Sequence, residues 1–341
     1  MNVLYIIGNG FDKAQGLRTS YPEFYQYLKD NSNNCSDLLR QLKKNIDENT
    51  ELWADMELAL GKFTSQIHTT DDFDNLYFEL CEHLQKYLQK QEIKFVPTIK
   101  LKNKFIQDLL NPYKYIDSTD TVSLNSFLEA MQDATSSVPF GAININIMSL
   151  NYTDTIEKLL PPDAINGSET NSFKYAINDS NYLEQIIHVH GQINDTIIVG
   201  VDNAGQIDNE QFRVDVNIQD LLVKEQSNIA MGETRHERCE QLIKNADVIV
   251  LYGVSLGETD AHWWHLIGKM FATNDLYIIQ HVYKRNFKEV PQTRKQLLGR
   301  IKRENRKSIM TKIGFDENEG NWPTDTNKRL FFMTNSNLFK L

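Results

Sequence analysis

The chain has 341 residues, 40% of them hydrophobic, and a formal net charge of −10. This length predicts one large α/β domain or two modest ones with a sizeable core, and the acidic balance disfavours general nucleic-acid binding. The three cysteines form no C-x-x-C pair and no run approaches the ~20 apolar residues of a membrane helix, so we expect a cytoplasmic protein without disulfides, a signal peptide or a membrane partner.

The first predicted element is the strand Val3–Ile7, which ends in the turn Gly8-Asn9-Gly10-Phe11-Asp12. Glycine allows another group to approach the backbone closely, and such a turn can aim amide groups at an anion. The turn is therefore a candidate phosphate site. The motif lacks the third glycine of the dinucleotide fingerprint, so a plain tight turn accounts for it equally well.

A long helical region follows this turn. Ser20 precedes Pro22, the pattern of a helix N-cap with proline in the first turn. From about Asp37 to Leu110 apolar residues recur at three- and four-residue steps, which is typical of amphipathic helices. We predict an almost wholly helical insertion over residues 21–138.

Strand patterns then return and alternate with helical stretches such as Thr259–Met270. This alternation predicts an α/β fold with a mostly parallel sheet and helices on both faces. Residues 1–20 and 139–341 would form the α/β nucleotide-binding domain. The expected strands after the insertion are Ile143–Leu150, Gln185–Val189, Thr196–Val201, Asp247–Tyr252 and Leu276–Val282.

Polar residues follow the predicted strand Ile143–Leu150 directly. In a parallel sheet the carboxyl ends of the strands line the ligand crevice, which makes Asn151, Thr153 and Asp154 candidate site residues. Capping of a short helix, Thr155–Leu160, explains Thr153 or Asp154 equally well, but it does not account for Asn151.

The next strand ends in His188-Val189-His190-Gly191. Period-two alternation places both histidines on one face of the strand. No third ligand with fitting spacing is visible, so we expect no metal site. A histidine at a strand end suits proton transfer or hydrogen bonding to a ribose, and His190 is the stronger candidate.

A fourth segment, Tyr252–Asp260, follows the strand Asp247–Tyr252 and offers Gly253, Ser255 and Leu256 as a second close-approach turn. Trp263 and Trp264 come shortly after it, and packing between a helix and the sheet explains at least one of these rings. Because all four segments follow predicted strands, we expect Gly8, Asn9, Asn151, His190 and Ser255 to converge on one cleft.

A basic stretch lies near the end of the chain. Lys284–Lys312 contains eleven Lys and Arg residues against Glu289 and Glu304. A solvated helix face explains this pattern, and a docking surface for nucleic acid or an acidic partner is the alternative.

As an ordered set, these motifs resemble the AbiH-type phage abortive-infection proteins from residue 1 to about 285, and a W-x-x-x-E stretch formed by Trp53 and Glu57 adds to the match. The resemblance implies a defence role with a phage-derived trigger, and leaves a homo-oligomer open. The motifs that carry it are Ile7–Asp12, Gly16–Tyr21, Asn151–Thr155, His188–Gly191 and Tyr252–Asp260.

The chain is also distantly similar to the Sir2 superfamily, whose members cleave NAD. Gly16-Leu17 stands eight residues after Gly8, as in the sirtuin opening, and Leu150–Asp154, His190-Gly191 and Gly253–Ser255 resemble later sirtuin motifs. Asn9, Asp12 and Arg18 depart from that pattern, Asp154 is displaced by one position, and the zinc-binding cysteines are absent, so a sirtuin deacylase is disfavoured.

This second resemblance implies a Rossmann-like, Sir2-like fold and an NAD glycohydrolase that uses no metal. Asn151 would orient water or the ribose hydroxyls, His190 would accept a proton, and Asp12 would orient the nicotinamide ribose. A binding module for NAD or ADP-ribose that controls the helical insertion without turnover is the alternative. A nucleic-acid-directed effector using Lys284–Lys312 ranks last, because no acidic metal cluster supports a nuclease. The residues implied to bind NAD are Gly8, Asn9, Gly10, Phe11, Thr153, Asp154, Gly253, Ser255 and Leu256.

Overall fold

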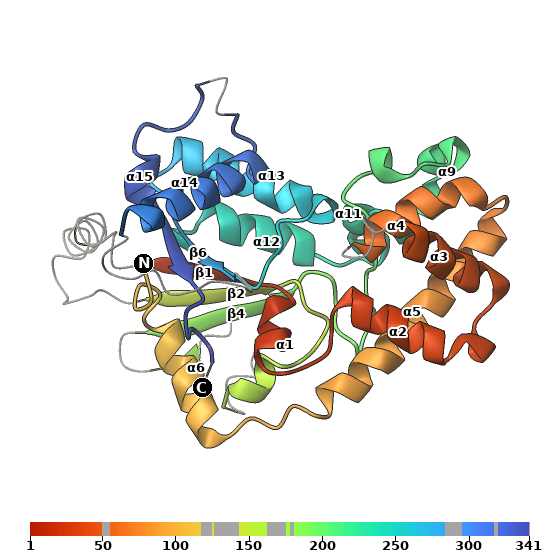
Figure 1. Cartoon of the computed structure of the whole chain (residues 1–341), viewed down its shortest axis with the longest axis horizontal. Coiled ribbons are helices and arrows are strands. Elements are labelled where there is room, and N and C mark those ends of the chain that lie inside the picture. Colours follow the sequence, from red (N-terminus) through yellow and green to blue (C-terminus); the bar gives the residue numbers. More distant parts are fainter. Residues whose placement is uncertain are drawn as a thin grey trace.

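The computed structural model describes residues 1–49, 55–116, 125, 143–161, 175–177, 181–283, 295–316 and 320–340. These residues form a sheet with helices on both faces and a helical lobe beside it (Figure 1). Residues 50–54, which include Trp53, residues 117–124 and 126–138 of the predicted insertion, and residues 284–294 of the basic stretch lie outside the described residues.

The sheet has the strand order β3-β4-β2-β1-β5-β6-β7, in which all neighbours are parallel except β3 and β4. β1 is central and pairs with β2 on one side and β5 on the other. The carboxyl ends of these strands therefore meet at one edge of the sheet. The strands are β1 (Asn2–Ile7), β2 (Asn144–Ser149), β3 (Tyr175–Ala176), β4 (Tyr182–His188), β5 (Val248–Tyr252), β6 (Tyr277–Val282) and β7 (Leu330–Thr334).

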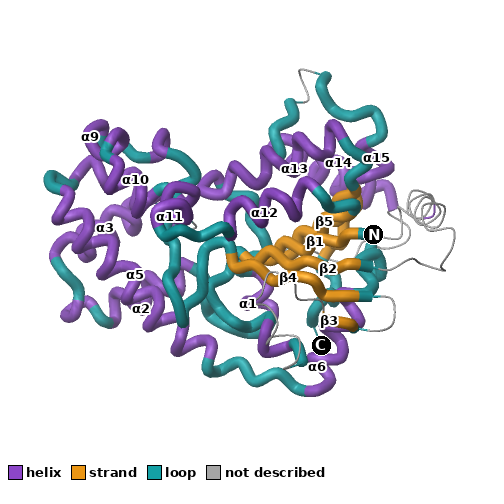
Figure 2. The backbone as a smooth tube through the Cα atoms, turned by 180° about the vertical axis from the view of Figure 1, so that it is seen from behind, coloured by secondary structure: helices purple, strands orange, loops and turns teal. Residues whose placement is uncertain are grey.

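Helices cover both faces of the sheet (Figure 2). Successive side chains of β1 point to opposite faces, and Val3, Tyr5 and Ile7 belong to one core with α6 while Leu4 and Ile6 belong to another with α13 and α14. The helices on the face of Val3 and Tyr5 are α1 (Gly10–Ala14) and α6 (Ile99–Leu109). The helices on the other face are α12 (Arg235–Lys244), α13 (Ala261–Thr273) and α14 (Lys295–Lys312), and the short helix α15 (Thr326–Arg329) precedes β7.

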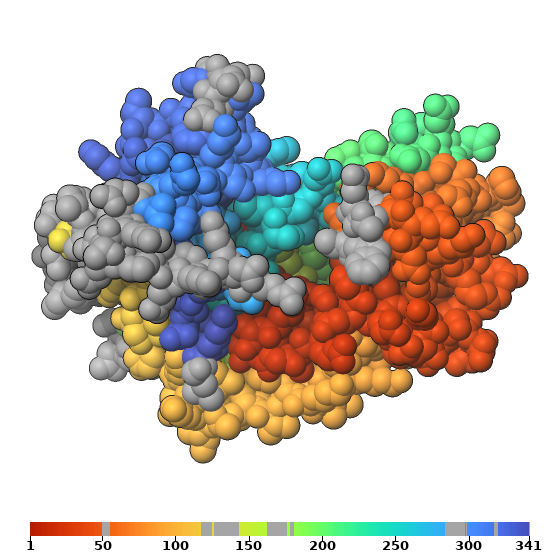
Figure 3. Space-filling view, viewed as in Figure 1, coloured from red at the N-terminus to blue at the C-terminus, as the bar shows by residue number. Residues whose placement is uncertain are grey.

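The helical lobe is built from two separate stretches of sequence. Phe212, Ile218 and Leu222 share a buried cluster with residues of the first stretch, such as Leu60 and Phe73. The light-green residues near 210–220 lie against the orange residues in Figure 3. The lobe helices are α2 (Tyr21–Asp30), α3 (Asp37–Glu48), α4 (Met56–Phe63), α5 (Thr70–Glu92), α9 (Glu210–Val214), α10 (Val216–Leu222) and α11 (Lys224–Ala230).

The predicted start of the first long helix is confirmed. α2 begins after Ser20, whose backbone N–H donates to Glu23 Oε2 at 3.1 Å, and Pro22 lies in the first turn. Ser20 and Glu23 thus form a capping box, in which each residue caps the backbone of the other. The helical segment predicted after the first strand is present in the described residues. α6, however, packs on the sheet rather than in the lobe.

One predicted strand is wrong. Residues 196–201 make only isolated bridges, which pair Gly191 with Ile197 and Val201 with Val223. Ile197, Val199 and Val201 are instead buried in the core of the helical lobe. An apolar run needs burial, and here the lobe supplies it without a sheet. Among the described residues, no helix combines the length and the hydrophobicity that a membrane span requires.

Candidate functional site

The carboxyl ends of the central strands border a cavity of about 590 Å³ between the sheet and the helical lobe. This volume is in the range of cofactor and small-molecule sites, roughly 300–1,000 Å³. The predicted residues that line it are Gly8, Asn9, Gly10, Asp12, Asn151, Thr153, His190, Gly253 and Ser255, and the lobe adds Tyr21, Asp55, Glu57, Leu84 and Leu88.

Three amides of the predicted phosphate turn already donate hydrogen bonds within the protein. The N–H of Gly8 donates to Tyr252 O and that of Gly10 to Gly253 O, each at 2.9 Å, and the Phe11 N–H donates to Gly8 O. These amides are therefore not free to bind an anion. A Cβ on Gly10 would lie 2.5 Å from Gly253 Cα. The glycines thus allow the turns after β1 and β5 to pack against each other.

Three predicted cofactor-binding residues do not line the cavity. Phe11 is fully buried against Phe105. Asp154 forms an ion pair with Lys158 at 2.8 Å, and Leu256 is buried in the core on the opposite face of the sheet, with a positive φ of 53°. Each of these side chains therefore has a structural role.

Asp12 is only 2% exposed and its carboxylate is held by threonine hydroxyls. Thr153 Oγ1 donates to Oδ2 at 2.7 Å and Thr155 Oγ1 to Oδ1 at 2.6 Å. Burial raises the pKa of Asp12 to about 6, although the two hydroxyls and the nearby His188 oppose the rise. Asp12 therefore ties the turn after β1 to the turn after β2.

Three hydrogen-bonding contacts fix Asn151, and one of its side-chain atoms has no partner. Its Nδ2 donates to Asp12 Oδ1 at 3.4 Å, its N–H donates to Ser149 Oγ at 3.2 Å, and its carbonyl lies 2.8 Å from His188 Nδ1. Its side-chain Oδ1 is buried and has no hydrogen-bond partner. The residue is thus fixed in place, lines the cavity and keeps one buried acceptor without a partner.

His188 connects the Asn151 backbone to Glu157. Its Nε2 lies 2.8 Å from Glu157 Oε1 while its Nδ1 contacts the Asn151 carbonyl. Burial disfavours the imidazolium, but Glu157 and the carbonyl outweigh it and raise the pKa of His188. His188 and His190 pair with different carboxylates and do not form a joint metal site.

His190 belongs to a buried charged network that links the sheet to the lobe. Its Nε2 lies 3.0 Å from Asp260 Oδ1, an ion-pair distance, and neither ring nitrogen makes a hydrogen bond with hydrogen-bond geometry. Lys224 Nζ lies 2.8 Å from the same Asp260 oxygen and 2.9 Å from Glu57 Oε2. Burial opposes ionisation, yet Lys224 and His190 hold the pKa of Asp260 well below its usual range. The carboxylate therefore stays charged beside the imidazole.

Sequence reasoning gave Lys224 no role and did not include Glu57 or Asp260 among the site residues. Glu57 and Asp260 lie within recognised motifs, which was the available signal. Lys224 follows Val223 at the start of a helix and resembles an ordinary surface lysine, yet it is 5% exposed. Its role depends on Glu57, 167 positions away.

The other acidic wall residue is Asp55, which caps α4 through the Leu58 N–H at 2.9 Å. Burial and the neighbouring Glu57 raise the pKa of Asp55 to about 6. Together with Asp12 and Asp260 it gives the cavity a carboxylate-rich lining. Such a lining suits a cationic or hydroxyl-rich ligand group.

The described part of the basic stretch is α14, which is not simply a solvated face. Ile309, Met310 and Ile313 pack into the core on the second face of the sheet, and Lys302 is 8% exposed. α14 therefore serves at least partly as a covering helix for the sheet.

Comparison with known proteins gives one family. The model described as bacteriophage abortive infection AbiH matches residues 4–312. No curated protein matches the chain. The family match covers most of the 341 residues, including every strand end that borders the cavity. The chain therefore belongs to the AbiH family of bacteriophage abortive-infection proteins.

Proposed function

We propose that this abortive-infection protein acts by hydrolysing NAD at the nicotinamide–ribose bond in the cavity beside β1, β2, β4 and β5. The observation that carries the proposal is the pair Asn151 and His190, which line one cavity and each keep a buried polar atom without a partner. The similarity of the surrounding motifs to the Sir2 superfamily supports NAD as the substrate.

The carboxylate-rich wall fits the chemistry of this bond. Nicotinamide leaves as a neutral molecule and takes the bonding electron pair, so its departure needs no general acid. The ribose gains positive charge in the transition state, and fixed oxygen dipoles stabilise such charge in a preorganised site. Asn151 Oδ1 and the carboxylate of Asp55 are the groups suited to this task.

His190 is suited to accept the proton of the attacking water. A carboxylate at one imidazole nitrogen orients the ring for proton transfer at the other, and Asp260 lies beside Nε2. The water oxygen bonds to the ribose carbon, its proton passes to His190, and the products are ADP-ribose and nicotinamide. Asp12 would act as a positioning residue, because its oxygens are engaged by Thr153, Thr155 and Asn151.

A binding module without turnover is the second candidate. The engaged oxygens of Asp12 favour it, because one of the three predicted catalytic groups is already hydrogen-bonded to neighbouring side chains. The cavity is lined from both the sheet and the lobe, so bound NAD or ADP-ribose would hold the two together and control a response.

Calorimetry with NAD and chromatography of released nicotinamide test both candidates. The full chain is assayed alone and with a lysate of phage-infected cells, since a permanently active enzyme would kill its host. Asn151→Ala and His190→Ala should each lower nicotinamide release by about a hundredfold or more. His68→Ala, an exposed residue outside the cavity, is the matched control.

The outcomes separate the candidates. Nicotinamide release that depends on Asn151 and His190 supports the hydrolase. NAD binding without release in either arm supports the binding module and contradicts the hydrolase. If the protein neither binds NAD nor releases nicotinamide, whether alone or with the lysate, both candidates are contradicted.

A further inference from the structure

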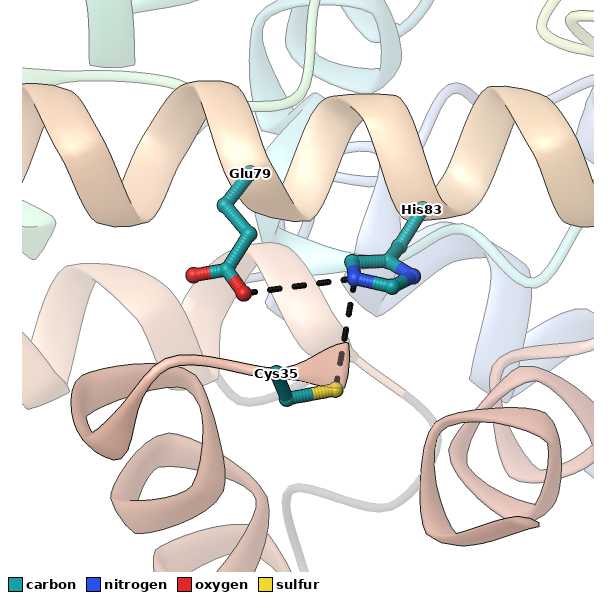
Figure 4. A group of neighbouring side chains, drawn as sticks. All are labelled: Cys35, Glu79 and His83. Carbon is teal, nitrogen blue, oxygen red and sulfur yellow. Dashed lines mark hydrogen bonds and ion pairs between the residues drawn. The ribbon is translucent and has the colours of Figure 1, made fainter. Parts of the chain in front are cut away.

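Three side chains of different chemistry converge in the helical lobe, away from the cavity (Figure 4). Glu79 and His83 lie one helical turn apart on α5, so their side chains share one face of the helix. Cys35 comes from the segment between η1 (Ser32–Asn34) and α3. The thiol and the carboxylate both point at Nε2 of the His83 ring.

The contacts to His83 are long: the Glu79 carboxylate lies beyond hydrogen-bond distance, and the Cys35 thiol makes only a weak hydrogen bond with the ring nitrogen. His83 Nε2 lies 3.9 Å from Glu79 Oε1 and 4.0 Å from Cys35 Sγ, whereas N–H···O bonds are usually about 2.7–3.2 Å. All three ligand atoms lie within 4.8 Å of one another. Zinc binds these atom types at about 2.0–2.3 Å, so a contraction of a few tenths of an ångström would bring all three onto one ion.

The surrounding structure holds the ligands near this geometry. The Ser36 N–H donates to Glu79 Oε1 at 2.7 Å, which orients the carboxylate as outer hydrogen bonds orient metal ligands. The Cys35 N–H donates to Ser32 O at 3.2 Å. Cys35 is 7% exposed and the His83 side chain 12% exposed. The group is thus preorganised and largely shielded from water.

We propose that Cys35, Glu79 and His83 bind one zinc ion that ties the segment before α3 to α5. A mixed sulfur, nitrogen and oxygen set suits this metal, and water would complete the tetrahedron. On binding, the thiol proton leaves to solvent and a zinc–thiolate bond forms without any change of oxidation state. α5 also carries Leu84 and Leu88 of the cavity wall, so the ion would steady one wall of that cavity.

A second group, His236, Glu240 and His262, is the rival among the described residues. His262 Nε2 lies 3.0 Å from Glu240 Oε1, a distance that a direct hydrogen bond explains without a metal. Lys244 Nζ also donates to Glu240, at 2.5 Å. This group is therefore a weaker candidate for a metal site, and its variants serve as a comparison in the experiment.

Titration of the metal-stripped full chain with Zn²⁺ and Co²⁺ tests the proposal. We expect one tightly bound Zn²⁺ per chain, and a thiolate-to-cobalt charge-transfer absorption with Co²⁺. Cys35→Ser should abolish the absorption, and His83→Gln should weaken Zn²⁺ binding by at least about tenfold. Cys81→Ser, a buried cysteine on α5 outside the group, should change neither.

Thermal unfolding provides a readout of folding in the same samples. Zn²⁺ should raise the midpoint of the wild type and Cys81→Ser but not of Cys35→Ser, because a ligand bound only by the native state stabilises it. Absence of Zn²⁺ binding, or equal affinity in wild type and Cys35→Ser, would overturn the proposal. The proposal would also be overturned if His236→Gln lost Zn²⁺ binding while Cys35→Ser and His83→Gln kept it.

Discussion

Thr155 Oγ1 donates a hydrogen bond to Asp12 Oδ1 at 2.6 Å, although the two residues are 143 positions apart in the sequence. The bond joins the turn after β1 to the turn after β2, and Thr153 adds a second one to the other carboxylate oxygen. Asp12 is thereby removed from water and kept next to Asn151. The candidate site thus depends on a buried carboxylate whose oxygens accept hydrogen bonds from three neighbouring side chains.

Asp12→Asn should make the protein less sensitive to pH. Burial raises the pKa of Asp12 to about 6, whereas in the unfolded chain it is about 3.9. The native state therefore keeps a proton that the unfolded state loses between about pH 4 and 6, so stability falls as pH rises through this window and stays lower above it. Asparagine does not titrate and avoids this loss.

Urea denaturation of wild type and Asp12→Asn at pH 5 and pH 8 measures the effect. From pH 5 to pH 8 the free energy of unfolding of the variant should improve relative to wild type by about 1 kcal/mol. An equal difference between the two proteins at both pH values would show that Asp12 ionises in the folded protein as it does in the unfolded one.

Lys224→Met should destabilise the protein strongly. It removes the partner of Glu57 and Asp260 and leaves two carboxylates in a buried network. Breaking a buried ion pair from one side costs about 3–5 kcal/mol. Urea denaturation gives the value directly.

The matched control is Lys86→Met, which removes a lysine paired with Glu82 on the surface of α5, where both side chains are at least 60% exposed. Exposed helical pairs are worth about 0.3–0.5 kcal/mol. If both variants lose the same small amount of stability, the network around Lys224 does not hold the lobe to the sheet.

Gly10→Ala should push apart the turns after β1 and β5. The new Cβ would meet the backbone of Gly253 at 2.5 Å, and backbone cannot move aside as a flexible side chain can. Overpacking of this kind costs about 1–3 kcal/mol. Thermal unfolding should therefore show a lower midpoint.

Gly299→Ala is the opposite case. It lies in α14, where a new Cβ would lie 3.7 Å from Nη1 at the flexible end of Arg303. Alanine favours helix over glycine by up to about 1 kcal/mol, so this variant should be slightly stabilised. A neutral Gly10→Ala would refute the close packing of the two turns.

Much of the fold was accessible from the sequence because buried parallel strands are continuous apolar runs. Val3–Ile7 and Asp247–Tyr252 were predicted almost to the residue. Residues 196–201 carry the same pattern, but the lobe core buries them instead. The short strand β7 at Leu330–Thr334 was missed. Composition tells that a segment is buried, not which surface buries it.

The candidate site was accessible only in part, for a related reason. Because residues at the strand ends of a parallel sheet line its crevice, Asn151 and His190 could be predicted to lie at the same cavity, and both do. Local sequence does not say where a backbone amide donates, so the hydrogen bond from Gly10 to Gly253 was not foreseen. Partners distant in sequence were also hidden, as with Lys224 and Glu57, or Cys35 and His83, which are 48 positions apart.

The most direct test of the account is the NAD content of cells during phage infection. Cells carrying the wild type should lose NAD and accumulate nicotinamide and ADP-ribose once infection begins, because the proposed reaction consumes NAD. Cells carrying Asn151→Ala or His190→Ala, at equal protein levels, should keep their NAD and fail to arrest the phage. Growth arrest in wild-type cells with NAD unchanged would contradict the hydrolase.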